Sequence, residues 1–133
     1  MIVHYVDSSA WAKLLVEEQE SAALDRFVRT ALKAGDAFGS SELLTTELHR
    51  LATRLGVQQA DVTAVLAVVV LTVPTRQVFR VAGLLAGEVR SLDALHVASA
   101  LDCGAGSFIS YDVRQLAAAA SAGLPTLSPG AAA

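Results

Sequence analysis

The sequence has little cysteine, few aromatic residues and little charge. A single cysteine, Cys103, excludes an internal disulfide and a zinc site built from several cysteines. Only 17% of the 133 residues are charged and 5% are aromatic, whereas 53% are hydrophobic. Such a chain is not disordered, because disorder requires low hydrophobicity and high net charge.

Long apolar runs are also absent. The longest uninterrupted run covers residues 64–71, far fewer than the ~20 residues that span a bilayer. Residues 1–7 lack a basic segment and reach an acid too early for a signal peptide. Together with the shortage of cysteine, these features predict a cytoplasmic protein without membrane attachment.

Basic residues are not in excess. With 10 Lys and Arg against 13 Asp and Glu, the formal net charge is −3. This disfavours a protein that holds nucleic acid on a broad basic surface, since neutralising phosphates takes an excess of cations. It leaves open an enzyme that meets phosphates through metal ions, because bound ions invert the local charge.

Strand-like and helix-like segments alternate, which predicts an α/β fold with a short parallel sheet flanked by helices in three layers, α/β/α. The length fits one domain, placed at residues 1–130, with a disordered tail at 131–133. The expected strands are 2–6, 37–39, 71–73, 107–110 and 126–127. The expected helices are 8–18, 21–33, 42–55, 58–69, 75–87, 92–103 and 113–122. Serines are the expected N-caps of three helices: Ser8 or Ser9, Ser40 or Ser41, and Ser91.

Two of the expected strands end in an aspartate, Asp7 and Asp112. In open parallel sheets, ligands bind beyond the carboxyl ends of the strands. Asp93 lies in the first turn of its helix, where the helix dipole favours an anion. Glu47 flanks the leucine stripe of its own helix. The four acids can therefore converge where helices meet the strand ends.

Acids packed together repel one another and raise each other's pKa values unless a cation lies between them. Carboxylates and water suit Mg²⁺ or Mn²⁺, whereas zinc prefers His or Cys. Such a cation can position a water and offset charge on a phosphodiester. Each acid taken alone is also explained as a helix cap or a solvated surface residue, so this pattern predicts a candidate site and no more.

The segments around the four acids resemble the motifs of PIN-domain proteins, particularly the VapC-type toxins of bacterial toxin–antitoxin pairs. These segments are residues 6–14, 41–50, 92–100 and 108–112, the last followed by a helix and a Gly-Leu-Pro turn at 123–125. They stand in the family's order, and the resemblance extends over residues 2–129. Together they are far more specific than any one of them.

The resemblance implies a PIN-like fold and a Mg²⁺- or Mn²⁺-dependent endoribonuclease, the toxin of a type II toxin–antitoxin pair. It implies RNA as substrate, a homodimer, and inhibition by a VapB-like antitoxin that inserts a segment near the acids. Carried over position by position, the catalytic and metal-binding acids are Asp7, Glu47, Asp93 and Asp112.

Three further residues are expected to support the acids. Ser8 follows Asp7 and is expected to orient it, and His96 lies one helical turn after Asp93. Ser110 matches a serine or threonine that lies beside the metal site in the family. The chain departs from the pattern at Arg114 and Gln115, where some members carry a further acid, so a second complete metal sphere is not implied.

The sequence leaves two alternatives open. One is a PIN-like module that binds RNA or protein without catalysis because its metal site is incomplete. The other is a different Mg²⁺-dependent α/β phosphotransfer enzyme. It is disfavoured because no Asp-x-Asp follows the first strand and no Gly-x-x-x-x-Gly-Lys loop occurs. The sequence also does not separate arginines that contact RNA from arginines that keep the protein soluble.

Overall fold

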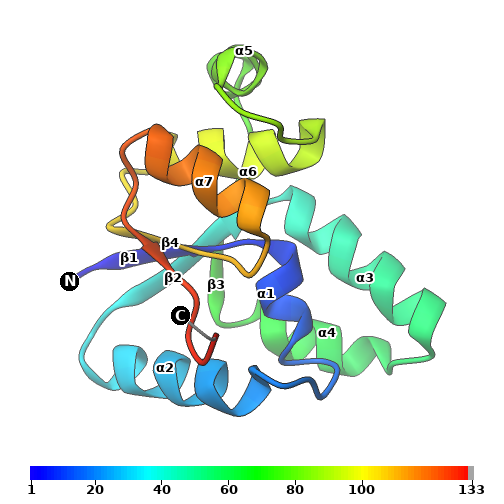
Figure 1. Cartoon of the computed structure of the whole chain (residues 1–133). Helices are drawn as coiled ribbons and strands as arrows, with labels where there is room; N and C mark the ends of the chain where they lie inside the picture. Colours follow the sequence, from blue (N-terminus) through cyan, green and yellow to red (C-terminus); the bar gives the residue numbers. More distant parts are fainter. Residues whose placement is uncertain (132–133) are drawn as a thin grey trace.

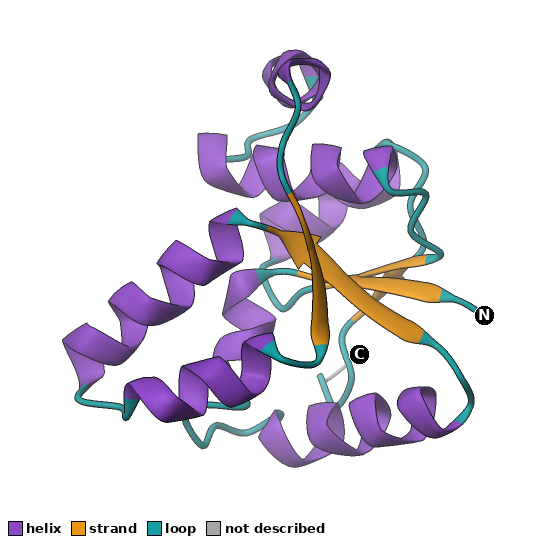
Figure 2. Cartoon of the chain, turned by 180° about the vertical axis from the view of Figure 1, so that it is seen from behind, coloured by secondary structure: helices purple, strands orange, loops and turns teal. Residues whose placement is uncertain are grey.

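The computed structural model describes residues 1–131 and shows a parallel sheet with helices on both of its faces (Figures 1 and 2). Its described strands lie in the order β3-β2-β1-β4-β5, and the pairings between them are parallel. Their bounds are β1 (Val3–Val6), β2 (Ala37–Ser41), β3 (Val69–Thr72), β4 (Ser107–Ile109) and β5 (Thr126–Leu127). The predicted α/β fold with a short parallel sheet is confirmed.

The helices of the described chain cover the two faces separately. They are α1 (Ser8–Ala12), α2 (Ser21–Lys33), α3 (Leu43–Leu55), α4 (Gln59–Leu66), α5 (Arg76–Leu84), α6 (Ser91–Asp102) and α7 (Val113–Ser121). Successive residues of a strand point to opposite faces, so Val6 joins the core under α1 to α4, while Tyr5 joins the core under α6 and α7. Helix α5 packs on α6 and projects from the body in Figure 1. Among the helices of residues 1–131, none has both the length and the apolar character needed to cross a membrane.

Two predicted serine caps are wrong. Helix α1 begins directly after β1, and the carboxylate of Asp7 accepts a hydrogen bond from the Ala10 N–H (3.0 Å), so Asp7 takes the place expected for Ser8 or Ser9. Ser91 is itself the first residue of α6. The reason is the same in both cases: the helix begins at the serine itself, so the residue before that serine occupies the N-cap position.

At α3 a serine does serve the helix N-terminus, from the end of the preceding strand. The hydroxyl of Ser41 accepts a hydrogen bond from the Leu43 N–H (3.2 Å), and Glu42 between them makes no side-chain cap. β2 therefore leads into α3 with a single residue between them.

Three helices end several residues earlier than predicted. Helix α1 ends at Ala12, well before residue 18, and α4 ends at Leu66 because the valines that follow pair with β2 instead. Helix α5 ends at Leu84, since the next residue has an extended backbone. Pairing within the sheet overrides local helix propensity at α4. Of the tail expected at 131–133, residues 132–133 lie outside the described residues, and Ala131 donates a main-chain hydrogen bond to Ser128 (3.0 Å).

The direction of chain winding reverses at β1. Strands β2 and β3 follow on one side of β1, and β4 and β5 lie on the other, so the topological switch point falls between β1 and β4. Val6 and Ile109 are partners in this pairing, which places Asp7 and Ser110 side by side just beyond the strand ends. Ligands bind at this position in open α/β sheets.

Candidate active site

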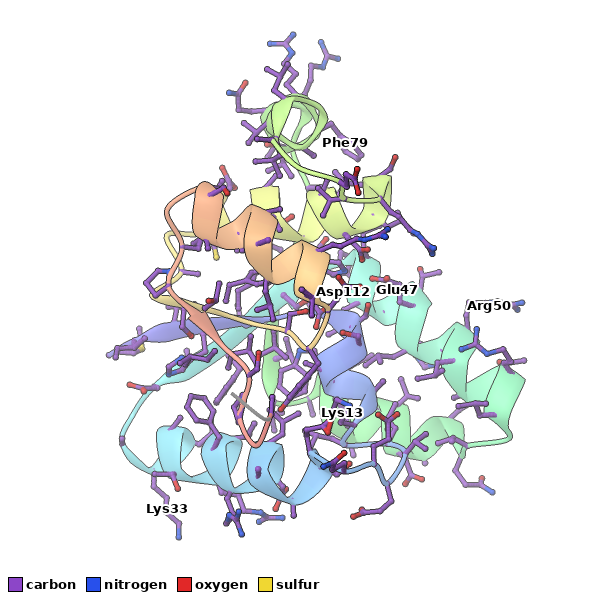
Figure 3. All side chains as sticks on the ribbon, viewed as in Figure 1. Lys13, Lys33, Glu47, Arg50, Phe79 and Asp112 are labelled. Atoms are coloured by element: carbon purple, nitrogen blue, oxygen red, sulfur yellow. The ribbon has the colours of Figure 1, made fainter. Side chains whose placement is uncertain are left out.

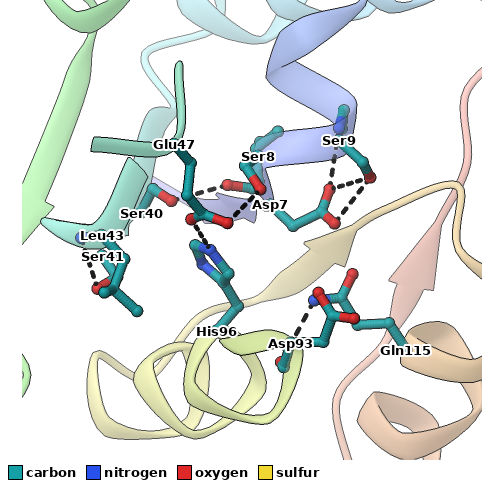
Figure 4. A network of polar contacts seen from close by, with 12 residues as sticks. Asp7, Ser8, Ser9, Ser40, Ser41, Leu43, Glu47, Asp93, His96 and Gln115 are labelled. Atoms are coloured by element: carbon teal, nitrogen blue, oxygen red, sulfur yellow. Dashed lines mark hydrogen bonds and ion pairs between the residues drawn. The ribbon is translucent and has the colours of Figure 1, made fainter. Parts of the chain in front are cut away.

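Asp7 is the most buried of the four predicted acids, with an exposed fraction of 2%. Its Oδ1 accepts the Ala10 N–H, and the Ser9 hydroxyl lies 2.8 Å from Oδ2 (Figure 4). The Ser110 hydroxyl lies 3.2 Å from the same Oδ2. Burial raises the pKa of Asp7 to about 6, although the hydrogen bonds from Ser9 and Ala10 favour its ionised form.

Glu47 lies on α3 beside Leu48, whose side chain is buried in the core. Its two oxygens have separate partners: Oε1 lies 2.7 Å from Nε2 of His96, and Oε2 accepts a hydrogen bond from the Ser8 hydroxyl at 3.0 Å (Figure 4). The side chain remains 24% exposed. Ser8 thus holds Glu47 and not its neighbour Asp7, contrary to our expectation, and His96 supports the same acid.

Asp93 and Asp112 lie on the other side of the switch point. With Arg90 and Arg114 they line a cavity of about 340 Å³ between α6 and α7. Asp112 caps α7 by accepting the Gln115 N–H at 3.0 Å. Partial burial raises the pKa of Asp93, and the nearby carboxylates of Asp112 and Glu47 raise it further. Figure 3 shows Glu47 and Asp112 at the same end of the sheet.

The donor set fits a hard divalent cation. Carboxylates and hydroxyls are the oxygen ligands that Mg²⁺ and Mn²⁺ prefer. The like charges that raise the pKa of Asp93 are the repulsion that a cation offsets. Across residues 1–131, no three His, Cys, Asp or Glu side chains lie close enough together to form a preassembled ligand set.

The structure brings the four predicted acids to one edge of the sheet and adds three residues that the sequence did not reveal. Ser9 binds Asp7, and Tyr5 binds His96 (2.7 Å). Gln115 lies three residues after the cap of α7, a spacing typical of a capping box. This spacing is the sequence feature that could have drawn attention to Gln115. The Gln115 side chain, however, does not cap the helix and contacts Ser110 and the main chain of Asp93 instead.

Comparison with known proteins gives the same family. The PIN domain model matches residues 4–121. The chain belongs to the PIN-domain family and, within it, to the VapC group. It is 34% identical over 137 aligned positions to the ribonuclease VapC46 of Mycobacterium tuberculosis, covering 97% of this chain and 99% of that protein. It is 32% identical over 134 positions to the ribonuclease VapC47 of the same species, and the match covers 96% of this chain and 97% of that protein.

Two solved structures share the fold. One is VapBC2 from Rickettsia felis bound to a DNA fragment from its promoter, with a TM-score of 0.76 and 9% identity over 96% of this chain and 99% of that chain. The other is VapC20 of Mycobacterium tuberculosis, a toxin that cleaves the sarcin–ricin loop, with a TM-score of 0.69 and 22% identity over 95% and 99%. At these identities the likeness concerns the fold alone.

Proposed function

We propose that this protein is the toxin of a type II toxin–antitoxin pair, acting in the cytoplasm as a Mg²⁺- or Mn²⁺-dependent endoribonuclease. The observation that carries the proposal is the gathering of Asp7, Glu47, Asp93 and Asp112 at the switch point of a VapC-type PIN domain. An RNA substrate, a VapB-like antitoxin and a homodimer belong to the same proposal.

In this proposal Asp7 and Asp93, with Glu47 and Asp112 completing the set, hold the cation. When bound, the cation supplies Lewis acidity for the attack of water on an RNA phosphodiester. The chain's own groups provide position and charge. Ser9 holds the carboxylate of Asp7, and the Ser110 hydroxyl lies beside the same oxygen.

Two arginines beside the acids have the chemistry to bind the substrate. Arg90 and Arg114 line the cavity next to Asp93 and Asp112. Guanidinium groups bind phosphate oxygens in a two-point geometry, so these side chains orient the RNA backbone over the acids.

The test is cleavage of total RNA by wild type and by Asp7→Asn, each with Mn²⁺ and with chelator. We expect chelator or Asp7→Asn to lower the rate roughly 100-fold or more, a loss of about 2.7 kcal/mol of transition-state stabilisation. Asp25→Asn is the matched control, because this aspartate pairs with Arg29 on the surface of α2. Cleavage that survives both chelator and Asp7→Asn overturns the proposal.

A second function has one observation in its favour. Gln115 stands where some family members carry an acid, and its amide adds no charge to the site. A PIN-like module that binds RNA or protein without cleaving it is consistent with such a reduced site. Calorimetry with Mn²⁺ distinguishes the two functions: the nuclease binds the ion, and the non-catalytic module does not.

A further inference from the structure

The side chains behind Glu47 form a continuous chain of hydrogen bonds across the sheet. The Ser41 N–H donates to the hydroxyl oxygen of Tyr5 (2.9 Å), and that hydroxyl lies 2.7 Å from Nδ1 of His96. Nε2 of His96 then lies 2.7 Å from Oε1 of Glu47 (Figure 4). The four residues come from the end of β2, from β1, from α6 and from α3, so the chain joins four elements to one carboxylate.

The donor and acceptor roles along this chain follow from its two ends. A main-chain N–H only donates, so the Tyr5 oxygen accepts from Ser41, and a carboxylate only accepts, so Nε2 of His96 carries the ring proton and donates to Glu47. In the neutral ring Nδ1 then accepts, and the Tyr5 hydroxyl donates its proton to it. Tyr5 and His96 are fully buried, so no bulk water competes for these hydrogen bonds.

We propose that Tyr5 and His96 are positioning residues for Glu47. The Ser41–Tyr5–His96 chain fixes the Nε2–H tautomer of His96 and so holds the Glu47 carboxylate at the sheet edge beside Asp7. The inference rests on the proposed function, because that function assigns Glu47 to the cation site. Supporting hydrogen bonds of this kind orient metal ligands, and their loss costs about 10- to 100-fold in metal affinity.

The Ser8 hydroxyl completes the arrangement from the opposite side. It donates to Oε2 of Glu47, so each carboxylate oxygen accepts one hydrogen bond from the protein. A carboxylate oxygen has two acceptor sites, so each keeps one for a cation or its waters. The plane of the carboxylate is thereby fixed at both oxygens.

The ring of Tyr5 has a separate packing role. It stacks on Phe108 with centroids 5.6 Å apart and an interplanar angle of 7°. Tyr5→Phe keeps this ring and removes only the hydroxyl. This variant therefore separates the positioning role from the packing role.

The experiment measures Mn²⁺ affinity by calorimetry for wild type, Tyr5→Phe, His96→Leu and His96→Gln. We expect Tyr5→Phe and His96→Leu to weaken binding roughly 10-fold or more, and His96→Gln, which keeps a donor for Glu47, to recover most of it. In RNA cleavage at one subsaturating Mn²⁺ concentration, kcat falls while the KM for RNA is unchanged. Tyr111→Phe is the matched control, because the Tyr111 hydroxyl donates to the Pro129 oxygen (2.7 Å), outside the chain.

Nitrogen spectra of the histidine ring give a readout that needs neither metal nor RNA. Long-range ¹H–¹⁵N correlation is expected to show the Nε2–H tautomer of His96 in wild type and in Tyr111→Phe. In Tyr5→Phe the Glu47 carboxylate still favours Nε2–H, but Nδ1 loses its donor, so the ¹⁵N shift of Nδ1 is expected to move towards that of a nitrogen without a hydrogen bond. Near-UV circular dichroism checks that each variant is folded, and Tyr5→Phe decides the question should His96→Leu not fold.

The outcomes separate the two proposals. Wild type that binds Mn²⁺, with Tyr5→Phe binding it equally tightly, overturns this inference alone. An Nδ1–H tautomer in wild type also overturns it. A wild-type protein that binds no Mn²⁺ overturns the proposed function and this inference with it.

Discussion

The side-chain amide of Gln115 donates a hydrogen bond to the main-chain oxygen of Asp93, 3.3 Å away, and so joins α7 to the first turn of α6. Its oxygen lies 2.8 Å from the Ser110 hydroxyl, which lies 3.2 Å from Oδ2 of Asp7. A hydroxyl has one proton, so Gln115 competes with Asp7 for it. This fully buried neutral amide braces the acids without adding a further charge.

Gln115→Glu tests that role. The substitution puts a buried carboxylate beside the acids and removes the donor to Asp93. We expect the free energy of unfolding of the metal-free protein to fall by about 1–3 kcal/mol, the cost of leaving a buried polar group unsatisfied. Mn²⁺ is expected to restore much of the loss, because the added charge then faces a cation. Urea unfolding with and without Mn²⁺ measures both effects.

Gln77→Glu makes the same chemical change on the exposed surface of α5 and serves as the control. We expect it to leave the stability within about 0.5 kcal/mol of wild type. A metal-free Gln115→Glu protein as stable as this control contradicts the bracing role of the amide.

The raised pKa of Asp7 predicts how stability depends on pH. The folded protein holds its Asp7 proton up to about pH 6, whereas the unfolded chain releases it near the ordinary value of 3.8. The folded state binds more protons in this window, so the metal-free protein loses stability as the pH rises through it. The gap between the two pKa values corresponds to about 3 kcal/mol.

Asp7→Asn does not titrate, so we expect it to flatten the fall in stability between about pH 4 and pH 7. Urea unfolding in chelator across this range measures the effect. Asp25→Asn is expected to keep the wild-type profile. Parallel profiles for wild type and Asp7→Asn show that the burial of Asp7 does not govern the pH dependence.

A groove leads away from Glu47 and predicts where RNA binds. It has a volume of about 630 Å³ and is lined by residues of α1 and α3, with Lys13, Arg50 and Arg54 among its cations. Figure 3 shows where Lys13 and Arg50 lie relative to Glu47. Lys13 is nearly buried and paired with two glutamates, whereas both arginines are exposed. The arginines are therefore the cations of this groove that can meet phosphates.

We expect Arg50→Gln and Arg54→Gln to weaken RNA binding and leave Mn²⁺ affinity unchanged. Each lost phosphate contact lowers the slope of log affinity against log salt by about 0.7 for a single strand. Filter binding at several salt concentrations, in an Asp7→Asn background that does not cleave, gives the RNA affinity and its salt slope. Calorimetry on Arg50→Gln and Arg54→Gln without the Asp7 substitution gives the Mn²⁺ affinity. Arg26→Gln on the exposed side of α2 is the control. A salt slope equal to that of the control places the RNA elsewhere.

The positions of the acids were predictable because each is encoded locally. Asp7 and Asp112 follow apolar runs, Asp93 opens a helix, and the leucine stripe of α3 fixes where Glu47 points. The alternation of strand-like and helix-like segments predicted a parallel sheet, and in a parallel sheet the carboxyl ends of the strands lie at one edge. The convergence of the four acids at one edge of the sheet therefore followed from short-range patterns combined with one topological rule, whereas their assignment as a metal site came from the family resemblance.

The partners of the acids were not predictable, because they depend on strand order and on the first turn of α1. Tyr5 and His96 are 91 positions apart in the sequence and meet only because α6 packs over β1. Ser8 and Ser9 look interchangeable after Asp7, yet they turn to different carboxylates once the helix begins at Ser8. No local pattern encodes either outcome.

The opposite edge of the sheet contains a hydrogen-bonded His4–Asp36 pair that predicts a second pH effect. Nε2 of His4 lies 2.9 Å from Oδ2 of Asp36, whose Oδ1 accepts the Ile2 N–H at 3.1 Å. The hydrogen bond from His4, with that from Ile2, holds the pKa of Asp36 below its ordinary value of 3.8. The stabilisation is therefore complete above the ordinary pKa and is lost as the pH falls through the lowered one.

Asp36→Asn is expected to be less stable than wild type near neutral pH, with the difference shrinking as the solution is acidified below pH 3.8. The pair lies at the edge of the sheet away from the acids, so Mn²⁺ affinity and RNA cleavage are expected to remain at wild-type levels. Urea unfolding at neutral and acidic pH measures the first effect, and calorimetry measures the second. Should the stability difference between wild type and Asp36→Asn be the same at both pH values, the loss comes from packing. The charge of Asp36 then contributes nothing to stability.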